Sequence, residues 1–190
     1  MRRTIVPAPI VSKEEVLQRL TEAFRRVGYE GASMAFLAEQ TGLKKASLYH
    51  YFPGGKKEMG EAALAQVGLW LQDEILATLL QDKPPRERLQ AMSVRLDEFY
   101  QSGQKWCLVD LFSVGEAGQH FQSILKEALT TWMKELARVA EQAGVEKKLA
   151  RHRAEEVLIA LQGSLVMARA LGEPGLFLRT LRELPARMLD

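Results

Sequence analysis

The amino-acid sequence predicts an all-α protein of about nine helices. Apolar residues recur at steps of three and four along almost the whole chain of 190 residues, which is the spacing of one helix face. No segment alternates apolar and polar residues with the period of two that is typical of a half-buried strand. Glycine and proline residues stand between the periodic segments, where helices stop and start. The sequence therefore indicates helices joined by short turns, without a sheet.

The first predicted helix covers residues 13–27. Ser12 and Glu15 have the spacing of a capping box, in which each side chain bonds the backbone amide of the other residue. An apolar stripe follows, and Gly28 can adopt the left-handed conformation that ends a helix. Two prolines within residues 1–10 predict a short extended arm before this helix.

Two short helices follow, with a tight turn between them. Ser33 is the predicted N-cap of the first, which runs to Thr41. Gly42 permits a positive φ angle in the turn, and the second helix occupies about residues 44–52 before Pro53 prevents its continuation. This arrangement is typical of a helix-turn-helix, whose second helix enters the major groove of DNA while the first crosses the backbone.

Six further helices are predicted in a larger second part. They cover about residues 56–80, 84–101, 105–114, 121–143, 147–171 and 174–188. Small residues in the segment 147–171 would let another helix approach closely, which favours a dimer through the last two helices. The last helix also has an apolar face that needs a cover, formed by Phe177, Leu181, Leu184 and Met188. The alternative is that both helices only complete a core within one chain.

Charge and composition narrow the class of protein. Residues 1–60 carry ten Lys or Arg against six Asp or Glu, a net charge of +4, whereas the other residues carry 16 against 18, or −2. A basic N-terminal unit suits contact with DNA phosphates, although a solvated basic face is the alternative. No apolar run approaches the roughly 18 residues of a transmembrane helix, and a single cysteine, Cys107, agrees with a reducing interior. We expect a cytoplasmic protein without a membrane partner.

A set of spaced residues in the first third of the chain forms a specific pattern. Its members are Phe24, Gly28, Tyr29, Ala32, Ser33, Met34, Leu37, Ala38, Gly42, Leu43, Leu48, Tyr49, His50, Tyr51, Phe52, Lys56 and Met59. This pattern resembles the DNA-binding domain of the TetR (tetracycline-repressor) family over about residues 13–60. The resemblance implies an N-terminal arm and helix-turn-helix domain over residues 1–55, followed by a helical effector-binding and dimerisation domain over residues 56–190. It places the following residues at DNA-facing positions: Ser33, Lys44, Lys45, Ser47, Tyr49, His50 and Lys56.

The chain departs from the family pattern at one position of the second short helix. Ala46 stands where the family commonly has glycine, which should change how closely the helix approaches DNA and hence which bases it reads. The segments Pro53-Gly54-Gly55 and Trp106-Cys107-Leu108 are similar to an LmrA-like, multidrug-responsive subgroup of the family.

The middle helices carry the candidate effector site. Ligand sites are mostly apolar, with a few polar groups that orient the ligand. On this basis the predicted effector-binding residues are Trp70, Phe99, Trp106, Asp110, Phe112, His120 and Gln162. The alternative is that the aromatic residues are packed core and the polar ones are surface residues or satisfied partners. Glu116 and His120 lack a third ligand for a metal ion, no cofactor is expected, and Cys107 beside apolar neighbours is expected to be an inert buried thiol.

These observations predict a homodimeric repressor that binds a pseudo-palindromic operator and is released by a small apolar or aromatic effector. An effector among the middle helices would favour a conformer in which the long helix over residues 56–80 moves the two DNA-binding domains out of register. No nucleophile with a base, carboxylate pair or phosphate-binding glycine loop is visible, so an enzyme is not expected. Two alternatives stay open, namely a helical interaction module that lacks specific DNA binding and a helical enzyme with its catalytic group in the middle helices.

Overall fold

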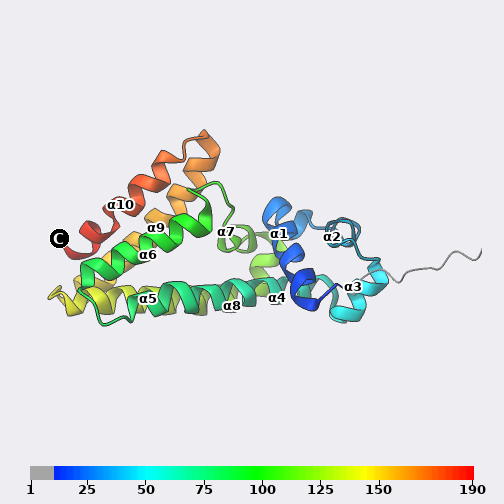
Figure 1. Ribbon diagram of the computed structural model, residues 1–190, viewed down its shortest axis with the longest axis horizontal. Coiled ribbons are helices and arrows are strands. Elements are labelled where there is room, and N and C mark those ends of the chain that lie inside the picture. The colour runs from blue at the N-terminus through cyan, green and yellow to red at the C-terminus, as the bar shows by residue number, and fades with distance from the viewer. Residues whose placement is uncertain (1–10) are drawn as a thin grey trace, which may run out of the picture.

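The computed structural model describes residues 11–190, and these residues form helices joined by turns, with no strand among them (Figure 1). The elements are α1 (Lys13–Gly31), α2 (Met34–Thr41), α3 (Lys45–Tyr51), α4 (Gly55–Trp70), the π-helix η1 (Leu71–Leu76), α5 (Ala77–Leu79), α6 (Pro85–Tyr100), α7 (Leu108–Phe112), α8 (Gly115–Gln142), α9 (Lys147–Leu171) and α10 (Gly175–Leu189). Because α4, η1 and α5 follow one another without a break, the described chain has nine helical runs, which confirms the predicted all-α fold. The arm predicted for residues 1–10 lies outside the described residues.

The molecule is elongated, with the three N-terminal helices at one end and α6, α9 and α10 towards the other (Figure 1). Two long helical runs, α4–η1–α5 and α8, extend between these ends. The short helix α7 lies at the junction, where it contacts α1 and α8. The end that holds the three N-terminal helices is therefore joined to the rest of the chain by long helices.

Local capping residues set the starts of the first two helices, although only one half of the predicted capping box forms, since the Glu15 carboxylate pairs with Arg19. The Ser12 hydroxyl accepts a hydrogen bond from the Glu15 amide at 3.1 Å, and the Ser33 hydroxyl accepts one from the Phe36 amide at 3.2 Å. Gly28 has φ 70° and interrupts α1, although a helical turn continues to Gly31. Gly42 has φ 71° and closes α2, so the tight turn before α3 is confirmed.

Two apolar clusters form the core. The first is built by α1, α2 and α3 with the start of α4, and it continues into α7 and α8 through Leu108, Phe112 and Phe121. The second is built by η1, α5, α6, α8, α9 and α10. Because the first cluster recruits residues from well beyond residue 55, the N-terminal helices pack as one body with α7 and the beginning of α8. The domain division at residue 55 stays a prediction.

The start of α8 differs from the expected residue 121. The helix begins at Gly115, and α7 before it is shorter than the expected 105–114. The carboxylate of Glu30 accepts a hydrogen bond from the Ala117 amide at 3.1 Å, so a residue from α1 caps α8. A cap that comes from 87 positions away leaves no local signal in the sequence.

The apolar face of the last helix is covered within the chain, which corrects the expectation that a partner is needed to cover it. Its four residues, Phe177, Leu181, Leu184 and Met188, are all at most 4% exposed. They pack in the second cluster, against α6 and α9. The apolar face that stays exposed belongs to α9 instead.

Candidate DNA-binding surface and effector cavity

Helix α3 presents a polar, basic face to solvent while one apolar residue anchors it. Leu48 is fully buried in the first cluster. Lys44 at the N-cap, Lys45 and His50 are exposed, and Tyr49 is 48% exposed. Helix α3 lies at one end of the molecule (Figure 1), and the exposure of these side chains is what a recognition helix requires. Ala46, the departure from the family pattern, lies on the same exposed stretch, and Ser47 is half-buried.

Helix α2 braces this surface through contacts with α1. Ser33 is exposed, and its hydroxyl is used to cap α2. Arg19 of α1 donates a hydrogen bond to the carbonyl oxygen of Thr41 at 2.7 Å, at the end of α2. The turn that sets the angle between α2 and α3 is thus held by a side chain from the first helix.

Lys56 is engaged within the protein. Its ammonium donates a hydrogen bond to the Tyr29 carbonyl oxygen at 3.0 Å and lies over the Tyr29 ring, 4.2 Å from the centroid. The side chain is half-buried and connects the start of α4 to the end of α1. The neighbouring Lys57, in contrast, is exposed and lies 4.0 Å from Glu61. In this conformation Lys56 therefore fixes the orientation of α4. Its ammonium is already engaged with Tyr29, unlike the exposed ammonium groups of Lys44 and Lys45.

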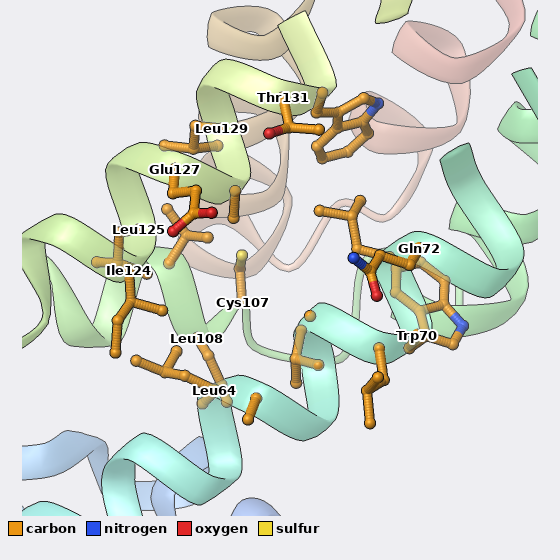
Figure 2. Close-up of a pocket in the computed structure, with 18 of the residues that line it drawn as sticks. Leu64, Trp70, Gln72, Cys107, Leu108, Ile124, Leu125, Glu127, Leu129 and Thr131 are labelled. Atoms are coloured by element: carbon orange, nitrogen blue, oxygen red, sulfur yellow. The ribbon is translucent and has the colours of Figure 1, made fainter. Parts of the chain in front are cut away.

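A cavity of about 420 Å³ lies among the middle helices (Figure 2). Its wall is mostly apolar and comes chiefly from α4, η1, α6, α7 and α8, with one residue each from α1 and α9. Its volume falls within the roughly 300–1,000 Å³ of small-molecule sites. Gln72, Glu127 and Thr131 line it and are exposed, so they mark its opening to solvent. The arrangement can hold an apolar molecule of moderate size.

Three of the seven predicted effector residues line this cavity. They are Trp70, Phe99 and Gln162. Trp70 and Phe99 stack on each other, with ring centroids 3.6 Å apart and an interplanar angle of 16°. They bring a flat aromatic surface from α4 and α6 to one wall.

The other four predicted effector residues are absent from the cavity wall, which corrects their placement. Phe112 is fully buried among the aromatic rings of the first cluster. His120 lies 3.0 Å from Glu116, four residues earlier on α8. Asp110 accepts a hydrogen bond from Arg169 at 3.3 Å, and the Arg169 guanidinium lies over the Trp106 ring. The partners of Phe112, Asp110 and Trp106 come from other elements, so the periodicity of isolated helices could not show them, whereas Glu116 lies on the same helix as His120.

Cys107 is buried, as predicted, and it also lines the cavity. It is 2% exposed, and its sulfur lies 3.3 Å from the Tyr100 hydroxyl oxygen. Figure 2 shows the sulfur directed towards the open space between α8 and the α4–η1 run. Burial raises the pKa of Tyr100 well above its ordinary value, so this hydroxyl stays protonated at neutral pH.

Arg25 is the buried charged residue of the cavity wall that sequence reasoning missed. It belongs to α1, in the DNA-binding end of the chain, and is only 3% exposed. It reaches the cavity wall because its side chain crosses to α6, where the guanidinium lies 5.0 Å from the centroid of the Phe99 ring. A basic residue on an amphipathic helix is ordinarily solvated, so the sequence carried no signal for this contact.

The described residues contain neither a metal-binding cluster nor a membrane span. No group of three or more His, Cys, Asp or Glu side chains within residues 11–190 is arranged to hold a metal ion. None of the helices in that range is both long and apolar enough to cross a bilayer. An exposed basic recognition helix at one end and a ligand-sized cavity between the middle helices define a helix-turn-helix regulator.

Comparisons with known proteins agree with this class. Residues 16–63 match the family model described as bacterial regulatory proteins, tetR family. The chain is 24% identical over 166 residues to the HTH-type transcriptional regulator LmrA of Bacillus subtilis. The matched segment covers 83% of this chain and 86% of LmrA. It is 33% identical over 98 residues to the HTH-type transcriptional repressor AcnR of Corynebacterium glutamicum, covering 47% of this chain and 50% of AcnR. Residues 16–63 therefore match the DNA-binding domain of the TetR family, and the relatives named here are transcription regulators that bind DNA.

Solved structures share the fold over nearly the whole chain. A TetR transcriptional regulator from Legionella pneumophila superposes with a TM-score of 0.80 at 20% identity, covering 98% of this chain and 100% of that one. The structure of AibR in complex with isovaleryl coenzyme A and operator DNA superposes with a TM-score of 0.60 at 17% identity, covering 80% of this chain and 85% of AibR. At these identities the likeness concerns the fold alone.

Proposed function

We propose that this regulator is a homodimeric repressor that leaves a pseudo-palindromic operator when a small apolar or aromatic effector occupies the cavity. The observation that carries the proposal is the continuity of α4 and η1. This helical run begins four residues after α3 ends and then lines the cavity. A ligand that changes the position of α4 would therefore change the position of the recognition helix.

The proposed DNA contacts follow from the exposure of each side chain and from the charge or hydrogen-bonding group that it presents to solvent. Lys44 and Lys45 reach base edges or phosphates from the start of α3, and Tyr49 and His50 contact phosphate oxygens. Ser47 bonds bases or phosphates from a half-buried position. In the same proposal, Ser33 faces the DNA backbone from the start of α2, and Lys56 contacts a phosphate after it is released from Tyr29.

An exposed apolar stripe on α9 supports a homodimer. Ile159 is 64% exposed, Val166 42%, Met167 51% and Leu171 57%. A Cβ placed on Gly163, in the same stripe, would meet no atom within 4 Å, so another helix has room to approach closely there. In the proposed dimer, α9 and α10 of each copy form a four-helix bundle. Two recognition helices held about 34 Å apart would meet successive major grooves on one face of DNA.

Effector binding is proposed to act by population shift. The effector binds more tightly to a conformer in which the two recognition helices no longer match the half-site spacing, so operator affinity falls without unfolding. Since both half-sites must be met together, a movement of a few ångströms at each α3 is enough. A cytoplasmic location is part of the same proposal.

The test is selection of bound duplexes from a random DNA library, followed by the salt dependence of binding to the best duplex. We expect an inverted repeat, and we expect the Lys44→Glu/Lys45→Glu variant to lose it because it places four units of negative charge difference per protomer against phosphates. The matched control is Lys147→Glu/Lys148→Glu, which makes the same change of charge at the start of α9. Absence of an enriched motif, or equal loss in both variants, would contradict the proposal.

A further inference from the structure

We propose that the effector is a hydrophobic carboxylic acid, with its body in the cavity and its carboxylate paired with the guanidinium of Arg25. This inference rests on the proposed function and specifies the chemistry of the ligand. Three observations support it. Arg25 is a buried cation in a mostly apolar wall, and it shares a single carboxylate with Lys105. In addition, the Nε of Arg25 makes no hydrogen bond among the described residues.

Only two charged side chains line the cavity among the described residues, and they differ in depth. Glu127 is exposed at the opening, where water screens its charge. Arg25 is 3% exposed and belongs to the inner wall, beside Phe99, Tyr100 and Cys107. A ligand in the cavity therefore meets one positive charge that is shielded from solvent. A ligand with a buried ammonium group would face this charge without a counter-ion.

The cation is incompletely neutralised by the protein. Arg25 and Lys105 both lie over the Phe99 ring, at 5.0 and 5.2 Å from its centroid. They share one carboxylate, that of Glu22, which is 3.5 Å from Arg25 Nε and 3.1 Å from Lys105 Nζ. Glu22 is half exposed, so much of its charge faces solvent. The cluster carries an excess of one positive charge beside an apolar cavity.

The hydrogen-bonding capacity of the guanidinium is only partly used. Its Nη1 donates a hydrogen bond to the carbonyl oxygen of Trp106, while the buried Nε makes no hydrogen bond among the described residues and has only the ion-pair contact with Glu22 at 3.5 Å. Burial lowers the pKa of Arg25 from its ordinary value, and the nearby charge of Glu22 acts in the opposite direction. A buried cation with a free donor is stabilised strongly by a carboxylate, because a charge-assisted hydrogen bond replaces the lost hydration.

The size and polarity of the cavity select a carboxylate over larger anions. A phosphate monoester carries about two charges and several acceptor oxygens, but the deep wall offers one guanidinium surrounded by aromatic rings. A carboxylate has one charge and matches the planar fork of an arginine. The stacked Trp70 and Phe99 rings provide an apolar surface next to this charge for the body of the acid.

Pairing with Arg25 would also connect the ligand directly to the DNA-binding end. Arg25 belongs to α1, the helix that holds the end of α2 through Arg19. A bound carboxylate competes with the Trp106 carbonyl oxygen for the same guanidinium. The effector therefore acts on α1 as well as on α4, and removal of Arg25 should weaken the effect of acids on operator binding.

The test compares matched ligands that differ only in the polar group. We would titrate the full chain with 4-phenylbutanoate, 4-phenylbutan-1-ol and 4-phenylbutylammonium, and with the corresponding acid, alcohol and amine of octane and of ethylnaphthalene. Binding is followed by calorimetry and by tryptophan fluorescence, since Trp70 and Trp132 line the cavity. We expect each acid to bind about ten-fold or more tightly than its alcohol, because a hydrogen bond to a charged group contributes about 1.5–3 kcal/mol, and each amine to bind most weakly.

Variants of Arg25 test whether this residue causes the preference for acids over alcohols. Arg25→Gln should bring acid and alcohol affinities within about two-fold of each other and leave alcohol binding unchanged. Arg25→Lys should keep the preference for the acid in reduced form, and the control Lys126→Gln, which removes an exposed charge from α8 outside the cavity, should keep it in full. If Arg25→Gln fails to fold, the comparison of acids, alcohols and amines on the wild-type protein tests the ligand class. The inference is overturned if no acid binds better than its alcohol, including the case in which no acid binds at millimolar concentration, or if the preference persists in Arg25→Gln.

Failure of this inference and failure of the proposed function give different results. The DNA selection contains no ligand, so an enriched inverted repeat together with no preference for acids would reject only the ligand class. A preference for acids without an enriched DNA motif would leave the cavity chemistry in place and reject the repressor.

Discussion

The backbone of Gly60 lies directly against the ring of Phe121. A Cβ at Gly60 would lie 2.8 Å from Cζ of Phe121, and it would also be 3.2 Å from ring atoms of Phe112 and Tyr29. Both phenylalanine rings are fully buried and Tyr29 is 3% exposed, so none of them has space to move away. This contact lets α4 pack closely on α8 and α7 at the point where the DNA-binding end joins the rest of the molecule.

We predict that Gly60→Ala destabilises the protein by about 1–3 kcal/mol, because it forces an additional carbon into a filled core. The control is Gly68→Ala in the same helix, where an added Cβ would meet nothing within 4 Å. That change should stabilise the protein by about 0.5–1 kcal/mol through the loss of backbone freedom in the unfolded chain. Urea unfolding of both variants measures the difference, and an equal effect of the two changes would contradict the packing argument.

A second prediction concerns a proline inside α10. Pro185 has no amide hydrogen, so the carbonyl oxygen of Leu181 lacks its helical donor. The hydroxyl of Ser93 on α6 lies 3.1 Å from that oxygen and 3.0 Å from the carbonyl oxygen of Leu89, so its one hydrogen is shared between the two acceptors. Ser93→Ala should therefore cost about 1–2 kcal/mol in the free energy of unfolding, because a half-buried acceptor loses its partner.

A double-mutant cycle tests this relationship. In a Pro185→Ala background, the new amide at residue 185 can donate to Leu181, so Ser93→Ala should cost clearly less than in the wild type. Identical costs in the two backgrounds would show that Ser93 acts in another way.

The third prediction is a loss of stability at alkaline pH that depends on Tyr100. Burial raises its pKa well above the ordinary value of 10.0, so the folded protein keeps this proton where the unfolded chain releases it. The contribution is therefore fully present below pH 10 and is lost as the pH rises further, by up to about 1.4 kcal/mol per pH unit. Urea unfolding of wild type and Tyr100→Phe between pH 8 and 11 isolates this contribution. A constant difference between the two proteins over that range would refute it. Tyr29, whose pKa is also raised chiefly by burial, is present in both proteins and cancels in the comparison.

The fourth prediction concerns the exposed stripe of α9. Ile159→Glu should convert a dimer into a monomer, because it places a charge in the centre of an apolar contact. The control Val94→Glu changes a residue of similar exposure, 56% against 64%, on α6. Sedimentation or light scattering measures the mass. A wild-type monomer, or a dimer that survives Ile159→Glu, would count against the proposed interface.

Local signals explain why much of the DNA-binding end could be predicted. The caps at Ser12 and Ser33, the left-handed Gly42 and the break after α3 each depend on residues within four positions. Lys44 and Lys45 stand at the start of α3 and are exposed, whereas Leu48, one turn further along the helix, is buried. The periodic spacing of apolar residues likewise indicated every helical run, and the errors occurred at helix ends.

The cavity could be predicted only in part, since its wall combines residues that are far apart in the chain. Trp70, Phe99 and Gln162 were selected because they are aromatic or amide residues of the middle helices, and all three line the cavity. The same reasoning also selected Phe112, which packs in the first apolar cluster. Arg25 could not be selected at all, because its burial depends on Phe99 and Trp106, more than 70 positions later in the chain.

By itself, then, the sequence determined the helices, the turn between α2 and α3 and the basic character of α3, because hydrogen bonds and side-chain spacing within a few residues decide them. Only the tertiary structure decided which apolar faces are covered. The face of α10 is buried against α6 and α9, whereas Ile159 and its neighbours on α9 stay exposed. It also decided that Arg25 lines the cavity and that Lys56 is held by Tyr29. The physical reason is that burial and charge pairing depend on distant partners, and one helix does not encode the position of another.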